Sequence, residues 1–125
     1  MALNIPEGNN HVMPYLILQS AAKFSEFVQN VFGASETMRH MNSDNTVMHA
    51  QVVIGDSTIM FADSNERFSP MTAGMFIYVA DADETYRKAL DAGCSSVMEP
   101  ADQEYGRACG VKDQFGNTWW ITGVR

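Results

Sequence analysis

The sequence predicts an α+β fold built from two tandem copies of one βαβββ module. A strand-like run, an amphipathic helix-like run and three further strand-like runs follow one another twice along 125 residues. The helix ends also match locally, as FVQNVFGAS at 27–35 and YRKALDAGCS at 86–95. A loop-rich segment at about 64–73 separates the copies. We therefore expect one domain over 1–125, with module one at about 10–63 and module two at about 74–124.

In module one, the run HVMPYLIL at 11–18 is expected to be a strand, and Ser20 suits the N-cap of the helix that follows it. Apolar residues recur at helical spacing from Ala21 to Val31, and Gly33 favours the left-handed conformation that ends a helix. The later strands are expected at 34–40, 47–54 and 58–62, with turns at 41–45 and 55–56. Because the second of these turns is Gly-Asp, it predicts an antiparallel hairpin.

Module two repeats this order. The run MFIYV at 75–79 is expected to be a strand, and Asp81 with Glu84 three residues later forms a carboxylate variant of the capping box. Gly93 is expected to end the helix that begins there. The remaining strands are expected at 96–99, 107–112 and 119–122, with turns at 100–102 and 113–117.

Composition indicates a globular chain and argues against several partners. The sequence is 46% hydrophobic and 18% charged, and no apolar run approaches the ~20 residues that a membrane span needs. The first residues lack the basic and apolar regions of a signal peptide, so we expect a cytoplasmic protein. Eight Lys and Arg against fifteen Asp and Glu give a net charge of -7. Because the cations are scattered, neither nucleic acid nor an anionic membrane is an expected partner.

Two further expectations concern the thiols and the assembly. Cys94 and Cys109 have neither metal-site spacing nor a CxxC arrangement, so we expect free thiols, to which the sequence assigns no role. Each module is too small to bury its own apolar face alone, so the copies share a core within one chain or pair between chains. A homodimer is the expected state.

Short motifs spread over nearly the whole chain point to a known family. They are MPYL at 13–16, the helix at 24–33, HAQ at 49–51, IGD at 54–56, the segment 79–83, YGR at 105–107 and KDQFGNTWWI at 112–121. In this order, and with the duplicated βαβββ pattern, they resemble the vicinal oxygen chelate superfamily (glyoxalase/bleomycin resistance/dioxygenase), and within it the PhnB-like branch. The resemblance implies a curved, cup-like mixed sheet around a ligand site, with the helices outside.

The resemblance also implies where a metal would lie. Enzymes of this superfamily usually hold a divalent ion with four side chains, one from the first and one from the last strand of each module. Here these positions are interpreted as Met13, Gln51, Gly74 and Trp120. The Gln51 amide is the single plausible donor among them, whereas a catalytic metal usually needs about three protein donors. We therefore expect no metal cofactor; a divalent metal such as Zn, Mn, Fe or Ni is the alternative.

Strand alternation predicts the side chains that line the cup. An aromatic cleft with few polar groups is typical of small-molecule sites, and Trp120 offers a stacking and cation–π surface in place of a metal donor. Arg107 is a candidate for an anionic ligand group, and His49 is a weak candidate for metal-free acid–base catalysis. The predicted ligand-binding residues are Tyr15, His49, Gln51, Phe76, Tyr78, Arg107 and Trp120.

Three hypotheses for the function follow. The favoured one is metal-independent binding of a small, planar or cationic organic molecule in an aromatic cup, similar to the drug-sequestering members of the superfamily. The alternative is a divalent-metal-dependent lyase, isomerase or dioxygenase with an atypical ligand set, for example His11, His49 and Gln51. The third is a ligand-free dimeric or regulatory module. Separately, Trp120 could merely fill volume in a closed cup, and Arg107 could be solvated or paired with a neighbouring acid such as Glu104.

Overall fold

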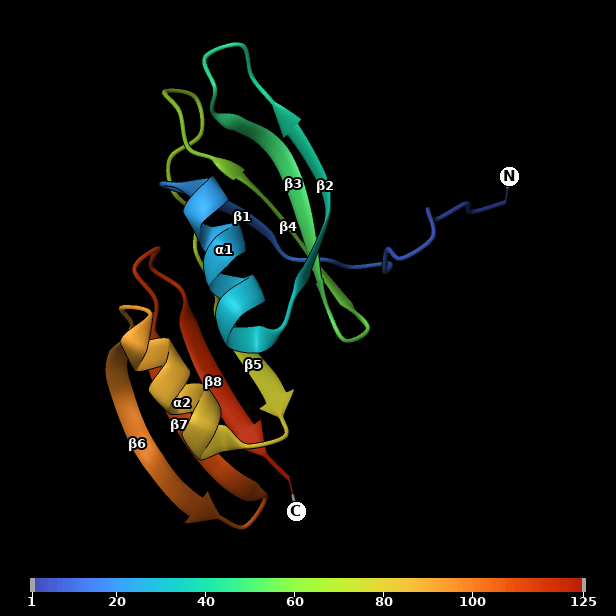
Figure 1. Cartoon of the computed structure of the whole chain (residues 1–125). Coiled ribbons are helices and arrows are strands. Elements are labelled where there is room, and N and C mark those ends of the chain that lie inside the picture. Colours follow the sequence, from blue (N-terminus) through green and yellow to red (C-terminus); the bar gives the residue numbers. More distant parts are fainter. Residues whose placement is uncertain (1, 125) are drawn as a thin grey trace. The chain divides into compact units, whose positions relative to one another are not determined.

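A computed structural model describes residues 2–124 and contains two helices and eight strands within them (Figure 1). The chain divides into two compact units, Met1–Met71 and Thr72–Arg125, and each unit contains one βαβββ module. The α+β class and the duplicated order are therefore confirmed. The eight strands lie in two separate four-stranded sheets, one in each unit. Neither helix in residues 2–124 has the length and hydrophobicity of a membrane span.

The first unit has a mixed sheet with one helix on it. Its elements are β1 (Tyr15–Leu18), α1 (Ala21–Phe32), β2 (Ser35–Met41), β3 (Val47–Ile54) and β4 (Ser57–Asp63). The strand order is β1-β4-β3-β2, in which β1 runs parallel to β4 and the other pairs are antiparallel. Helix α1 buries Phe24 against the sheet, where its ring meets the Phe61 ring edge-on at 5.1 Å. The predicted hairpin at 55–56 is confirmed.

Strand β1 is shorter than the predicted run 11–18 because Pro14 interrupts it. Proline has no N–H to donate, so only its carbonyl joins the ladder, accepting the N–H of Met60 at 3.0 Å. Leu16 and Leu18 are buried in the core, whereas Tyr15 on the other face is exposed. The short strand therefore separates an apolar face from one that is open for other contacts.

The start of α1 is held by a carboxylate rather than by the predicted serine cap. Ser20 occupies the N-cap position, but it has a left-handed backbone and its side chain makes no capping bond. Instead Asp63, at the end of β4, accepts the N–H of Ala21 at 2.8 Å and the N–H of Val47 at 2.7 Å. One side chain thus joins α1, β3 and β4. At the other end, Gly33 is left-handed and closes the helix as predicted.

The second unit repeats this arrangement. Its elements are β5 (Gly74–Val79), α2 (Ala82–Asp91), β6 (Ser95–Gln103), β7 (Gly106–Lys112) and β8 (Thr118–Gly123). The strand order is β5-β8-β7-β6, with β5 parallel to β8. The predicted cap is confirmed, because the Asp81 carboxylate accepts the N–H of Glu84 at 3.1 Å. Helix α2 ends at Asp91, and Gly93, with a φ of 107°, turns the chain toward β6 as the sequence predicts.

The predicted turn at 100–102 is wrong, because β6 continues through Pro100 as far as Gln103. The turn lies instead at 104–105, between β6 and β7. A proline is tolerated here for two reasons. Strand β6 is at the edge of its sheet, and its pairing with β7 is irregular between Met98 and Ala101.

The turn between β7 and β8 is organised by one buried carboxylate. Asp113 is 5% exposed and accepts the backbone N–H groups of Phe115 and Asn117, both at 2.9 Å. It also accepts the Nδ2 of Asn117 at 3.1 Å and the indole N–H of Trp119 at 2.8 Å. Asn117 in turn accepts the N–H of Ala73 at 3.0 Å, just before β5. Asp113 therefore sets the position of β8 against β5.

We predict that Asp113→Ala lowers the free energy of unfolding by about 3 kcal/mol or more, because the buried donors of Asn117 and Trp119 lose their acceptor. Chemical denaturation followed by circular dichroism measures this loss. Asp56→Ala, in the exposed turn between β3 and β4, is the matched control and should change stability by no more than ~0.5 kcal/mol. An equal loss of stability in the two variants would contradict the assignment of Asp113 as the carboxylate that holds this turn.

Candidate functional site

The ladder of the first sheet gathers a row of side chains on the face opposite α1. Cross-strand register places one residue from each strand in the row: Met38, Gln51, Met60 and Tyr15. The next row pairs His40 of β2 with His49 of β3. Because side chains at i and i+2 share a face, the two rows form one surface. This surface carries thioether, imidazole, amide and phenol groups side by side.

Hydrogen bonds join three of these side chains. Tyr15 Oη lies 3.1 Å from His49 Nδ1, and Gln51 Nε2 lies 3.3 Å from His49 Nε2. Because an amide nitrogen only donates, we assign the proton of the neutral ring to Nδ1, where Tyr15 Oη accepts it. Gln51 is only 6% exposed, so its contact with the imidazole is sheltered from water. The sequence-predicted residues of module one thus form one connected group.

His49 is held in its neutral form. Burial, as the larger cause, and the neighbouring His40 both lower the pKa of His49 below its ordinary value of 6.5. At pH 7 its ring is therefore neutral, and its Nε2 lone pair accepts the N–H of Gln51. This state suits a hydrogen-bond acceptor, a proton acceptor or a metal ligand.

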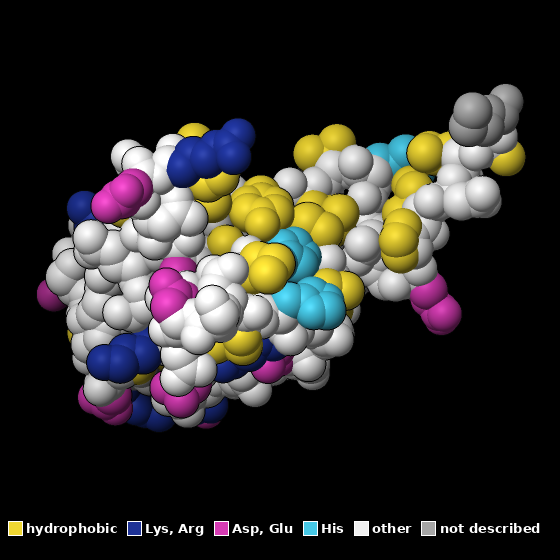
Figure 2. Space-filling model, turned by 90° about the horizontal axis from the view of Figure 1, so that it is seen from above, with side chains coloured by type: hydrophobic (Ala, Val, Ile, Leu, Met, Phe, Trp, Pro, Cys, Tyr) yellow, Lys and Arg dark blue, Asp and Glu magenta, His cyan; other side chains and the backbone are white. Residues whose placement is uncertain are grey.

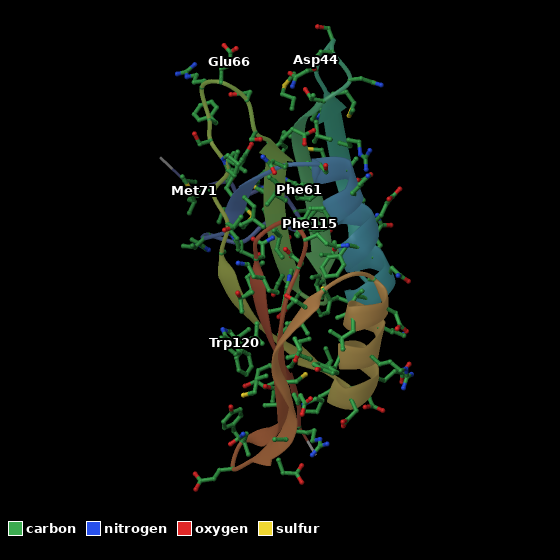
Figure 3. The ribbon with its side chains drawn as sticks, turned by 90° about the vertical axis from the view of Figure 1, so that its left-hand side faces the viewer. Asp44, Phe61, Glu66, Met71, Phe115 and Trp120 are labelled. Carbon is green, nitrogen blue, oxygen red and sulfur yellow. The ribbon has the colours of Figure 1, made fainter. Side chains whose placement is uncertain are left out.

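The second sheet carries an aromatic surface on its face opposite α2. The equivalent row is Phe76, Trp120, Gly110 and Met98. Trp120 is 40% exposed, Phe76 53% and Tyr78 70%, and the Phe76 and Tyr78 rings meet edge-on at 5.1 Å. Figure 3 shows Trp120 projecting from β8 on the side away from α2. Three exposed aromatic side chains thus share one face of the second unit.

Trp120 rests on a glycine. A Cβ atom on Gly110 would lie 2.8 Å from the Trp120 ring, closer than real Cβ contacts allow. Gly110 has no positive φ, so the reason for a glycine here is the close approach of the indole. The sequence alone does not reveal this support, because the pairing of Gly110 with Trp120 appears only in the register of β7 and β8.

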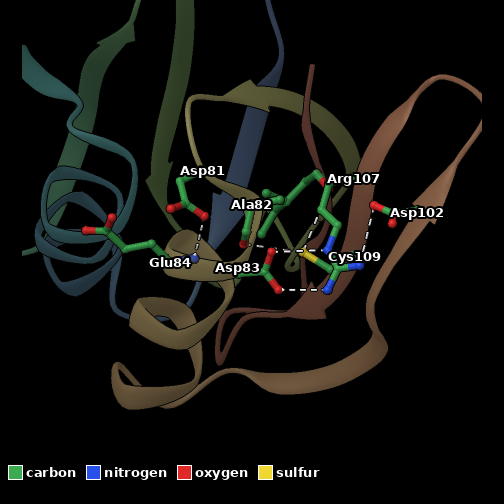
Figure 4. Close-up of polar contacts among 8 residues, drawn as sticks. Asp81, Ala82, Asp83, Glu84, Asp102, Arg107 and Cys109 are labelled. Carbon is green, nitrogen blue, oxygen red and sulfur yellow. Dashed lines mark hydrogen bonds and ion pairs between the residues drawn. The ribbon is translucent and has the colours of Figure 1, made fainter. Parts of the chain in front are cut away.

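The structure places Arg107 away from this aromatic surface. Alternation along β7 puts Arg107 and Cys109 on the α2 face, whereas Gly110 lies with Trp120. The guanidinium binds Asp83 of α2 through two bonds of 3.1 Å and pairs with Asp102 at 3.5 Å (Figure 4). Hydrogen bonding to Asp83 raises the pKa of Arg107 further. We therefore remove Arg107 from the candidate ligand contacts.

The positions compared with a superfamily metal site do not fit a divalent ion. Gln51 lies in β3, which corrects its assignment to the last strand of module one. Tyr15 lies five residues before the N-cap of α1 and pairs with Met60. Phe76 lies five residues before the N-cap of α2 and pairs with Trp120. Met60 of β4 is therefore the module-one equivalent of Trp120. The corrected positions are Met13, Met60, Gly74 and Trp120, which supply no charged or imidazole donor. Among residues 2–124, no group of three His, Cys, Asp or Glu side chains could hold a metal.

The two thiols are buried and free. Burial raises the pKa of Cys94 to about 12, with a contribution from Asp113. Burial also raises the pKa of Cys109 to about 11, and its Sγ contacts the carbonyls of Ala82 and Ile121. Neither thiol is a nucleophile near neutral pH, because the thiolate is the reactive form.

Comparison with known proteins agrees with this architecture. Residues 8–121 match the family model described as the Glyoxalase/Bleomycin resistance protein/Dioxygenase superfamily. An uncharacterized protein of Mycobacterium bovis is 29% identical over 131 residues, which cover 95% of this chain and 84% of that protein. The PhnB protein from Bacillus cereus has 17% identity and a TM-score of 0.71 over 92% of this chain and 100% of its own. TnmS3, an antibiotic binding protein from Streptomyces sp. CB03234, has 17% identity and a TM-score of 0.71, covering 93% and 97%.

We predict that Gly110→Ala displaces the Trp120 indole and lowers the free energy of unfolding by about 1–3 kcal/mol, because the new methyl group overlaps the ring. Tryptophan emission and chemical denaturation measure the two effects. Gly74→Ala is the matched control in the same sheet, since a Cβ there meets no atom within 4 Å. Unchanged emission in Gly110→Ala would show that the indole does not depend on this glycine.

We also predict that His49 titrates below pH 6.5 in the folded protein. The native state resists protonation of His49 more than the unfolded chain does. The contribution of neutral His49 to the free energy of unfolding is therefore complete above about pH 6.5 and is lost as the pH falls below that value. NMR titration of the imidazole protons measures the midpoint. In His40→Asn the midpoint should rise but stay below 6.5, because burial is the larger cause. A midpoint at or above 6.5 in the parent protein would refute this picture.

Proposed function

The chain belongs to the glyoxalase/bleomycin resistance protein/dioxygenase superfamily, and we propose that it binds a small, planar or cationic organic molecule without a metal. The observation that carries the proposal is the exposed indole of Trp120, which lies on Gly110 beside Phe76 and Tyr78. A ring held in close contact with Gly110 loses little freedom when a ligand stacks on it. This pre-organisation reduces the entropic cost of binding.

Charge favours a cationic ligand over an anionic one. The faces of Trp, Tyr and Phe attract cations, and the chain carries a net charge of -7. Arg107, the cation that the sequence suggests for an anionic ligand group, is already paired with Asp83 and Asp102. An aromatic or amphipathic cation therefore matches the second sheet better than a carboxylate or phosphate does.

The proposed activity is stoichiometric capture rather than turnover. The superfamily metal positions lack the donors that a divalent ion requires, and both thiols are buried with raised pKa values. The described antibiotic binding function of TnmS3 is a property of that protein, and it makes capture a reasonable class to test here. Tyr15, His49 and Gln51 remain proposed polar contacts of a ligand on the first sheet. The homodimer and the cytoplasmic location remain predictions.

Screening of planar aromatic cations by thermal shift and tryptophan fluorescence tests the proposal. A ligand at about 100 times its Kd should stabilise the fold by ~2.7 kcal/mol and quench the emission of Trp120. We expect Trp120→Ala to weaken binding at least tenfold, because it removes the stacking surface. The experiment should use protein treated with a chelator, so that binding is measured without metal.

Tyr105→Ala is the matched control, since Tyr105 is an exposed aromatic residue in the turn between β6 and β7 of the same unit. It should leave the Kd unchanged. The proposal fails if no planar or cationic compound shifts the midpoint, or if Trp120→Ala and Tyr105→Ala bind every active compound as the parent does. Restoration of binding only on addition of a divalent metal would favour the enzyme alternative instead.

A further inference from the structure

The first sheet carries a histidine pair, of which His49 is also a proposed polar contact of the ligand, whereas His40 has no part in the proposed function. His40 and His49 are direct register partners in the antiparallel ladder of β2 and β3. Register is continuous from the pair Met38 and Gln51 to the pair His40 and His49, so all four side chains lie on the same face. Directly opposed residues have Cβ atoms roughly 4.5–5.5 Å apart. Two imidazoles at that spacing are able to hold one ion between them.

This cluster is accessible. His40 is exposed, His49 is half-buried, and Met38 is 39% exposed, with its thioether one row along the same face. Figure 2 shows two histidine side chains in contact on the surface, with hydrophobic side chains beside them. Met38 and His49 are diagonal neighbours on adjacent strands, and the backbones of such residues lie roughly 7–8 Å apart, a distance that long side chains can bridge.

The hydrogen bonds of His49 match those of a metal ligand. Its Nδ1–H is directed at Tyr15 Oη, which fixes the orientation of the ring and leaves the lone pair on Nε2. The N–H of Gln51 occupies that lone pair at 3.3 Å, and rotation of the amide releases it. Ligating histidines usually donate their second ring N–H to an orienting carboxylate, backbone carbonyl or water, and the Tyr15 hydroxyl takes that place here.

We propose that His40, His49 and Met38 form a binding site for a soft transition-metal ion, monovalent copper. Imidazole nitrogen binds copper, and a thioether as third ligand selects Cu(I) over harder divalent ions. The donors come from β2 and β3, so the site differs from the superfamily positions in the first and last strands of each module. The site does not depend on the aromatic surface of the second sheet.

Anaerobic competition against a chromophoric Cu(I) chelator tests the proposal with the full chain. We expect one Cu(I) per chain, and a loss of affinity of at least tenfold in both His40→Ala and His49→Ala. Met38→Leu keeps the side-chain volume and should lose at least tenfold for Cu(I) while leaving binding of Zn(II) unchanged. Circular dichroism of each variant checks that the fold is retained.

Matched controls are available in the same chain. His11→Ala removes the remaining histidine, and Met48→Leu removes an exposed thioether of β3 that lies at an irregularity of the ladder and has no register partner in β2; neither should change the affinity for Cu(I). Titration of the unmodified protein with Ag(I) needs no variant and should shift the NMR signals of the Met38 methyl group and of both imidazoles. Absence of Cu(I) binding, or equal losses in His11→Ala and His40→Ala, overturns the site. An unchanged Cu(I) affinity in Met38→Leu overturns the assignment of the thioether.

Discussion

The parallel pairing of the first and last strands is the interaction on which each unit depends. A helix separates the first strand from the three that follow, and the first strand returns to the sheet beside the last, as β1 against β4 and β5 against β8. This pairing places Tyr15 beside Met60 and Phe76 beside Trp120. One carboxylate in each unit fixes the connections between these elements. Asp63 joins α1 to β3 and β4, and Asp113 holds the turn before β8. The rows of side chains that form both candidate surfaces are consequences of this register.

Much of the fold could be predicted from the sequence because local signals agreed with one another. Apolar periodicity identified both helices, Gly33 marked the end of one, and Asp81 marked the start of the other. The predictions that were wrong concern a turn and a helix cap, whose positions depend on residues distant in the sequence. Pro100 is acceptable within a strand only because β6 lies at the edge of its sheet. Similarly, the cap of α1 comes from Asp63, which is distant in sequence from the helix that it holds.

The candidate site was less accessible to sequence reasoning. Alternation along one strand indicates which side chains share a face, but it does not identify the neighbour on the next strand. Gly110 has no visible role until β7 is aligned with β8, and His40 has none until β2 is aligned with β3. Arg107 was a plausible ligand contact until the start of α2 supplied Asp83 as its partner. Register and packing, rather than residue type, decide these three cases.

The duplicated backbone presents two chemically different rows. Met38, Gln51, Met60 and Tyr15 form one, and Met98, Gly110, Trp120 and Phe76 form its counterpart in the second unit. Gln51 belongs to the first row and Gly110 to the second, and each row lies within its own sheet. The repeated βαβββ order therefore places different side chains at equivalent positions of the two sheets. One backbone order thus carries a polar row in the first half of the chain and an aromatic row in the second.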